Sequence, residues 1–184
     1  KSSRSIIKQR QLGTDIKSFH GALKHVLRQD PNVIMVGEMR DLETTSLAIS
    51  AAETGHLVLS TLHTVNASQT VERIVDMYPA NQQSQVRSML ANTLKAVISQ
   101  TLLPKIGGGM VPAVEILLCD PAVRNIIRES RTFEIPNVIE TNSRKGMVTR
   151  DPSISSLVFN GLVERDIAIA NSTDPQRLQM TLAA

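Results

Sequence analysis

Aromatic side chains and cysteine are both scarce in this sequence of 184 residues. It contains three Phe, one Tyr and no Trp, so its core must be built from aliphatic residues and Met. Proteins that hold single-stranded nucleic acid stack the bases on aromatic rings, and this composition argues against that function. Cys119 is the only cysteine, which excludes a disulfide or a Cys-based zinc site within one chain and favours a reducing compartment.

Long hydrophobic runs and a strong overall charge are also lacking. No apolar run reaches the roughly 20 residues of a membrane-spanning helix. The net charge is only +3, but residues 1–28 hold seven basic residues against one acidic residue. This segment could face phosphate, an acidic partner or water. A nucleic-acid interface is the less favoured alternative, because no recognition motif accompanies the basic residues.

A short apolar run, Val33 to Val36, is the centre of the sequence pattern and ends at Gly37-Glu38. Such a run predicts a strand buried on both faces, as in a parallel α/β sheet. In open α/β sheets the ligand binds beyond the carboxyl ends of the strands, so Glu38 would emerge at the ligand site. A carboxylate there can order a water or accept its proton during phosphoryl transfer. The alternative is a strand followed by an ordinary solvated turn.

A second apolar run, residues 56–62, ends at His63-Thr64 after a helix that we expect from Asp41 to about Glu53. Strand, helix and strand at this spacing predict a βαβ unit with parallel neighbouring strands. Glu38 and His63 would then face one crevice. A metal site made by His56 and His63 is less favoured, because their spacing along a strand points them to opposite faces.

Other patterns predict the remaining elements. We expect a strand over 5–12 and helices over 18–28, 66–77, 81–100, 121–129, 133–140 and 151–160, with one or two small helices after 162. The helix over 18–28 would bury Phe19, Ala22, Leu23, Val26 and Leu27, and the helix over 81–100 would bury Val86, Met89, Leu90, Leu94, Val97 and Ile98. The glycines at 107–109 predict a β-hairpin turn rather than a phosphate loop, since no helix and no Lys-Ser/Thr pair follow them.

Several blocks, in order along the chain, resemble the secretion ATPases that drive type II secretion and type IV pili. DPNVIMVGEMRDLET at 30–44 looks like the Walker B region of that family, and TGHLVLSTLHT at 54–64 looks like its His box. QTLLPKIGGGMVPAVEI at 100–116 and PAVRNIIRE at 121–129 are similar to the PilT-type retraction ATPases of twitching motility. The resemblance covers roughly residues 8–165 and is more specific than any single motif.

The resemblance implies a homohexameric motor that hydrolyses ATP to retract a pilus. Such a motor would be cytoplasmic and peripheral at the inner membrane, where pilus platform proteins would be its partners, with no nucleic acid and no membrane insertion. The implied fold is α/β: a partial RecA-like P-loop NTPase core over residues 1–118, with a parallel sheet and a β-hairpin, and a C-terminal helical subdomain over 119–184.

The resemblance also implies roles for individual residues. Glu38 matches the general base, and Mg²⁺ would be reached through nucleotide and water near Glu38 rather than bound directly by the chain. Nucleotide contacts fall on His63, Gly37 and Arg10, whereas His56 matches a position that serves packing. The residues associated with retraction lie on one helix: Arg124, Asn125, Arg128 and Glu129.

One departure from the family pattern concerns the phosphate-binding loop. The Walker A motif G-x-x-x-x-G-K-[ST] is absent from the 184 residues, as is the acidic Asp box, and the chain opens on Lys1. We therefore expect a C-terminal piece of a longer protein. Without the amides and lysine of that loop the phosphates lose their main cradle, so the piece alone should bind ATP weakly and not hydrolyse it.

Two alternatives stay open at this point. The first is a pilus-assembly or type II secretion ATPase, many of which carry a four-cysteine zinc insertion in this half of the chain. A single cysteine cannot form that insertion, which favours retraction. The second alternative is a non-catalytic ring subunit or interaction module.

Overall fold

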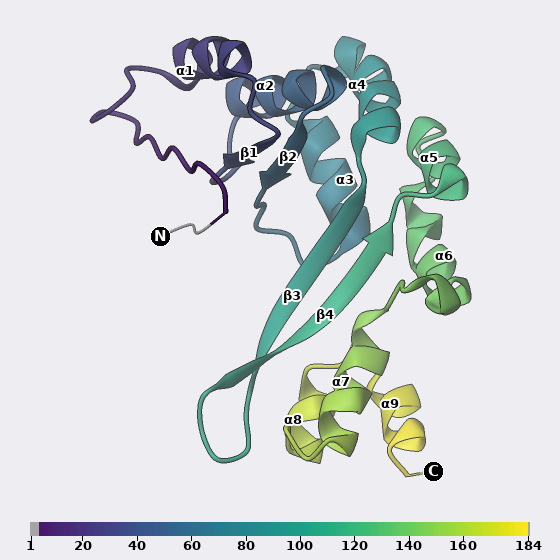
Figure 1. Ribbon diagram of the computed structural model, residues 1–184. Helices are drawn as coiled ribbons and strands as arrows, with labels where there is room; N and C mark the ends of the chain where they lie inside the picture. The colour runs from purple at the N-terminus through teal and green to yellow at the C-terminus, as the bar shows by residue number, and fades with distance from the viewer. Residues whose placement is uncertain (1–3, 184) are drawn as a thin grey trace. The chain divides into compact units, whose positions relative to one another are not determined.

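The computed structural model describes residues 4–183, except for the side chains of Phe19, His20, Leu23, Lys24 and Leu27 (Figure 1). Three members of the predicted apolar face of the first helix therefore lie outside the described side chains. The chain divides into two compact units, residues 1–62 and residues 63–184. None of the helices within 4–183 has the length and apolar character needed to span a bilayer.

The first unit is a βαβ unit, as predicted. It contains α1 (Phe19–Val26), a 3₁₀ turn (Leu27–Gln29), β1 (Val33–Val36), α2 (Leu42–Glu53) and β2 (Leu57–Ser60). The two strands pair in parallel, with Val33 opposite Leu57 and Val36 opposite Ser60. The carboxyl ends of both strands therefore meet at the same edge of the sheet.

Capping residues fix both ends of α2. The Asp41 carboxylate accepts a hydrogen bond of 2.8 Å from the Thr44 N–H, which satisfies one of the amides left free at a helix start. Thr54 closes the helix, and Gly55 follows with a φ of 98°, a left-handed conformation that favours glycine. The cap residue Asp41 and the Thr54-Gly55 stop explain why both ends of this helix could be predicted from the sequence.

The prediction that both strands are buried on both faces is wrong. Ile34 is buried against Ala51 of α2, but Met35 is 73% exposed and Val33 is 52% exposed. Leu57 and Leu59 of β2 are likewise about half exposed. The reason is that α2 covers one face of the sheet, so alternate residues of each strand face outward.

The predicted strand over residues 5–12 is also wrong. Within residues 4–183 this segment joins no sheet, and Ile6 is 92% exposed. Leu12 forms only an isolated bridge with Ile16, across a turn in which Gln11 accepts three backbone hydrogen bonds. An apolar, β-branched stretch becomes a strand only where another strand completes its hydrogen bonds.

The second unit begins with two helices and a long β-hairpin. It contains α3 (Ala67–Asp76), α4 (Ala80–Thr93), β3 (Ala96–Pro104) and β4 (Met110–Leu118). The hairpin is antiparallel, and the three glycines at its tip all have positive φ, as the predicted turn requires. The predicted helix over 81–100 is too long: α4 ends at Thr93, and Val97 and Ile98 belong to β3.

Shorter helices complete the second unit. They are α5 (Pro121–Arg128), a 3₁₀ turn (Thr132–Glu134), α6 (Ile135–Thr141), a 3₁₀ turn (Ser143–Lys145), α7 (Arg150–Phe159), α8 (Arg165–Ala170) and α9 (Pro175–Thr181). Figure 1 shows α7, α8 and α9 gathered beside the hairpin. Their shared core contains Leu103 and Ala113 from the hairpin and Ile154, Val163, Ala168 and Leu178 from the helical region. The division at residue 118 that the resemblance implies stays a prediction.

Candidate functional site

Glu38 lies at the carboxyl edge of the parallel sheet, where the β1–β2 pairing continues past the strands. The Thr61 hydroxyl donates to the Gly37 carbonyl at 2.6 Å, and the Met39 N–H donates to the Thr61 carbonyl at 3.1 Å. Thr61 thus holds the backbone on both sides of Glu38. The conformation of this turn is set by the strand that leads toward His63, rather than by Glu38 alone.

The Glu38 carboxylate is paired with a guanidinium two residues further along. Arg40 Nε lies 2.7 Å from Glu38 Oε2, with 22% of the Glu38 side chain and 75% of the Arg40 side chain exposed. The hydrogen bond to Glu38, helped by the opposite charge, raises the pKa of Arg40 above its usual value. A carboxylate at a strand end that stays partly exposed can contact a water molecule, while Arg40 occupies one of its oxygens.

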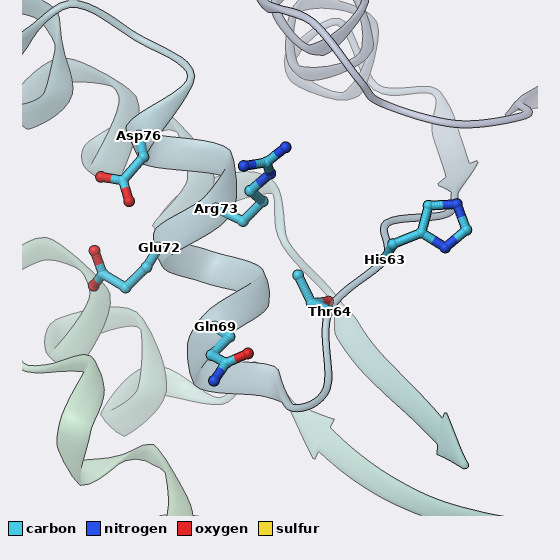
Figure 2. Close-up of a pocket in the computed structure, with 6 residues that line it drawn as sticks. All are labelled: His63, Thr64, Gln69, Glu72, Arg73 and Asp76. Atoms are coloured by element: carbon cyan, nitrogen blue, oxygen red, sulfur yellow. The ribbon is translucent and has the colours of Figure 1, made fainter. Parts of the chain in front are cut away.

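His63 belongs to the second unit, where it lines an open hollow of about 470 Å³. Figure 2 shows His63 and Thr64 on the segment before α3, with the other lining residues on successive turns of that helix. Those residues follow the i, i+3, i+4, i+7 spacing of one helix face: Gln69, Glu72, Arg73 and Asp76. The Gln69 amide and the Arg73 guanidinium can donate hydrogen bonds to an anion, whereas Glu72 and Asp76 repel one. Figure 2 shows the His63 ring turned away from this face of α3.

Arg10 and Gly37 occupy different parts of the first unit. The Arg10 guanidinium donates to Gln29 Oε1 at 3.2 Å and lines a hollow of about 310 Å³ beside the start of α1. Gln29 precedes β1 in the chain, whereas Gly37 and Glu38 follow it. The structure therefore brings Gly37 next to Glu38, and it places Arg10 beside α1 instead.

The four residues predicted for the retraction helix lie on α5. Asp120 caps this helix by accepting from the N–H groups of Ala122 and Val123, and Val123, Ile126 and Ile127 are buried on its inner face. Arg128 donates to Asn125 of the same helix at 3.2 Å and to Asn92 of α4 at 2.7 Å.

The two remaining residues of this set have different surroundings. Glu129 pairs with Arg131 at 2.6 Å. Arg124 keeps a buried Nε that has no hydrogen-bond partner among the described residues. The polar side of α5 thus carries charge of both signs.

His56 lies between α2 and β2, and the packing role that the resemblance implies for it stays a prediction. Its Nδ1 lies 3.1 Å from the Ala51 carbonyl and 3.1 Å from the Thr54 hydroxyl, at the end of α2. No group of three or more His, Cys, Asp or Glu residues within 4–183 is placed to hold a metal ion.

Sequence reasoning missed Arg40 and Thr61. A usable signal existed for Arg40, because residues i and i+2 of an extended segment point to the same side, and Arg40 is two residues from Glu38. No local signal marks Thr61, since its contact with Gly37 spans 24 residues and depends on the register of the sheet.

Comparison with known proteins identifies similar chains. A family described as type II/IV secretion system protein matches residues 5–146. The chain is 47% identical over 175 residues to the type IV pilus retractation ATPase PilT of Pseudomonas aeruginosa, covering 95% of this chain and 51% of that protein. It is 52% identical over 168 residues to a twitching motility protein of Neisseria gonorrhoeae, covering 91% of this chain and 45% of that protein.

A solved structure extends the similarity to the fold. The crystal structure of the pilus retraction motor PilT with bound ADP superposes with a TM-score of 0.84 at 47% identity, covering 95% of this chain and 49% of that chain. The α/β architecture, with its parallel strands and antiparallel hairpin, is thus that of a known nucleotide-bound protein. This chain spans about half the length of each of these three proteins.

Proposed function

Because this chain belongs to the type II/IV secretion system protein family, we propose that it is part of an ATPase motor that powers type IV pilus retraction. The names of its relatives support this proposal, since they describe a pilus retraction ATPase and a twitching motility protein. The chain spans about half of those proteins, so the activity of the whole motor is assigned here as a proposal.

The observation that carries the proposal is the placement of Glu38. It lies at the carboxyl edge of a parallel sheet, where Thr61 forms hydrogen bonds with the backbone of both neighbouring residues and Arg40 pairs with the carboxylate. Glu38 would accept the proton of the attacking water, while His63, Gly37 and Arg10 would contact the nucleotide. Mg²⁺, reached through nucleotide and water, would supply positive charge at the phosphates.

Retraction is preferred over assembly or secretion for two reasons. Cys119 is the only cysteine, so a four-cysteine zinc insertion is absent from these residues. The α5 residues Arg124, Asn125, Arg128 and Glu129 carry the retraction-associated pattern, on a helix whose polar side is accessible to a partner. We propose further that the motor is a homohexamer that works at the cytoplasmic face of the inner membrane with pilus platform proteins.

Replacement of the matching half of the Pseudomonas aeruginosa PilT by these 184 residues tests the function. We expect the chimera to hydrolyse ATP and to restore twitching to cells that lack PilT. Glu38→Gln should reduce the turnover number at least about a hundredfold, because it removes the base but keeps the shape of the side chain. The measurements are phosphate release by the purified chimera and twitching zones on agar.

The 184-residue chain on its own is the control for the phosphate-binding loop. We expect it to release no phosphate above background, since its residues contain no Walker A motif to cradle the phosphates. Turnover by the isolated chain that Glu38→Gln abolishes would refute this expectation. An active chimera that fails to restore twitching, but restores pilus extension to cells that lack the assembly ATPase PilB, would replace the proposed direction with assembly.

A further inference from the structure

The short segment between His63 and α3 is held by side chains from much later in the sequence. Arg150 Nη2 donates to the Val65 carbonyl at 2.7 Å, across 85 residues. The Ala67 N–H donates to Glu115 Oε1 at 2.7 Å, across 48 residues. These two anchors lie on either side of Asn66, the residue that caps α3, and all of these residues belong to the second unit.

Both anchors come from one well-packed part of the second unit. Arg150 is the first residue of α7, and Glu115 lies on β4. The Val114 N–H donates to the Ser153 hydroxyl at 3.0 Å, which joins the strand to the helix next to both anchors. Ile154 of α7 is fully buried against the hairpin. The two anchors are therefore fixed relative to each other by the core beneath them.

The bond from Arg150 is of a kind that restricts the backbone strongly. A charged guanidinium donating to a carbonyl makes a stronger hydrogen bond than a neutral pair, and it fixes the orientation of the Val65–Asn66 peptide plane. Val65 itself is 57% exposed, so side-chain burial contributes little to its position. Only Thr64 separates this fixed carbonyl from His63.

We propose that Arg150 is a positioning residue, which ties α7 and the C-terminal helices to the segment that carries His63. The inference rests on the proposed function, in which His63 contacts the nucleotide. A displacement of α7 would move the Val65 carbonyl and, through one intervening residue, the imidazole. Arg150 thus makes the C-terminal helices part of the nucleotide site without contacting the nucleotide.

Amide hydrogen exchange of the 184-residue chain tests the anchoring step. Arg150→Met removes the charged donor but keeps an unbranched side chain. We expect exchange of the Ala67 amide, which donates to Glu115 two residues after the anchored carbonyl, to rise about tenfold. Arg150→Lys keeps a charged donor and should restore most of the protection. Arg165→Met is the matched control, because Arg165 also donates to a backbone carbonyl, that of Gln179, but outside this segment. Unchanged exchange in Arg150→Met would overturn the proposal.

ATP hydrolysis by the chimera defined above tests the positioning step. We expect Arg150→Met to raise the KM for ATP about three- to tenfold with little change in kcat or melting temperature, and Arg150→Lys to reverse the effect. In a His63→Ala background the same substitution should have no further effect on KM, because it acts through His63. An unchanged KM in Arg150→Met would overturn the positioning role. A chimera that is inactive with Arg150 in place would instead overturn the proposed function, while hydrogen exchange still decides the anchoring.

Discussion

The ion pair between Arg40 and Glu38 affects the direction of the Glu38 carboxylate more than it affects the free energy of unfolding. Both partners contact water, and an exposed pair of this kind contributes little to the free energy of unfolding. It engages one carboxylate oxygen, Oε2, at the point where Thr61 already bonds the backbone on both sides of Glu38. In the proposed function Glu38 accepts a proton from water, and both contacts would help to place its carboxylate.

Cys119 has the properties of a structural thiol. It is 8% exposed, and burial raises its pKa to about 12. At pH 8 only about one thiol in ten thousand would be ionised, and the thiolate is the reactive form. We expect an aromatic disulfide reagent to label the folded chain very slowly at pH 8 and the urea-unfolded chain within minutes.

The variant Cys119→Ser provides the control for this labelling experiment. It should take up no reagent in either state, which would assign the signal to Cys119. Fast labelling of the folded chain, at a rate close to that of the unfolded chain, would contradict the burial of this thiol.

The places of Glu38 after β1 and of His63 after β2 could be predicted from the sequence. The crevice that the two residues are expected to share stays a prediction, and their contacts could not be predicted. Each residue follows a short apolar run, and such runs end where the strand reaches the sheet edge. The contacts of Thr61 and Arg150 instead link residues 24 and 85 positions apart. Contacts of this kind depend on strand register and helix packing, which no local pattern encodes.

At the level of secondary structure, the boundary between α4 and β3 shows why long helices were overpredicted. Val86, Met89, Leu90, Leu94, Val97 and Ile98 fit a helical stripe, and the strand pattern from Ala96 onward also fits an alternation of buried and exposed residues. The backbone turns to an extended conformation at Leu94, with φ −61° and ψ 127°. Pairing with β4 then decides between the two patterns, and that partner lies beyond a glycine turn.

The cap of α5 gives a prediction about one helix. The Asp120 carboxylate accepts from two N–H groups at the helix start and pairs with Lys145 at 2.9 Å. We expect Asp120→Ala to lower the free energy of unfolding by about 1–2 kcal/mol, as for other helix caps. Lys145→Met keeps the cap and removes only a partly exposed ion pair, so it should cost less than about 1 kcal/mol. Urea unfolding followed by circular dichroism measures both.

The loss of unfolding free energy in Asp120→Ala should depend on pH in one direction. The hydrogen bond to Lys145 holds the pKa of Asp120 below its ordinary value. The ionised Asp120 carboxylate therefore contributes its full stabilisation to the folded chain above the unfolded pKa, about 4. This stabilisation is lost as the pH falls through the lower folded pKa. The stability difference between the native chain and Asp120→Ala should shrink on acidification. A difference that grows below pH 4 would contradict this account.

At the scale of the whole molecule, the two units differ in how much apolar surface each buries. The first unit has a small core around Ile34 and Ala51, with Met35, Ile6 and Ile7 largely exposed. The second unit buries many large side chains completely, among them Leu103, Leu117, Ile127, Ile135, Ile139 and Ile154. The fold class was predictable because it depends on the order of helices and strands along the chain. The difference in buried apolar surface depends instead on which faces of those elements pack against another element.

The difference in buried apolar surface between the two units predicts which strands unfold locally most often. Amides with little buried apolar surface around them exchange through low-energy local openings, whereas those in a large core need opening of the whole unit. Protection should therefore be higher in β3 and β4 than in β1 and β2, by about a hundredfold or more at neutral pH. Hydrogen exchange of the native chain, followed residue by residue, measures this protection directly.

Ala51→Gly, which removes a buried methyl group from the core around Ile34, should speed exchange in β1 and leave exchange in β4 unchanged. Equal protection of β1 and β4 would contradict the prediction, because it would mean that exposed residues such as Met35 do not mark a weakly held sheet.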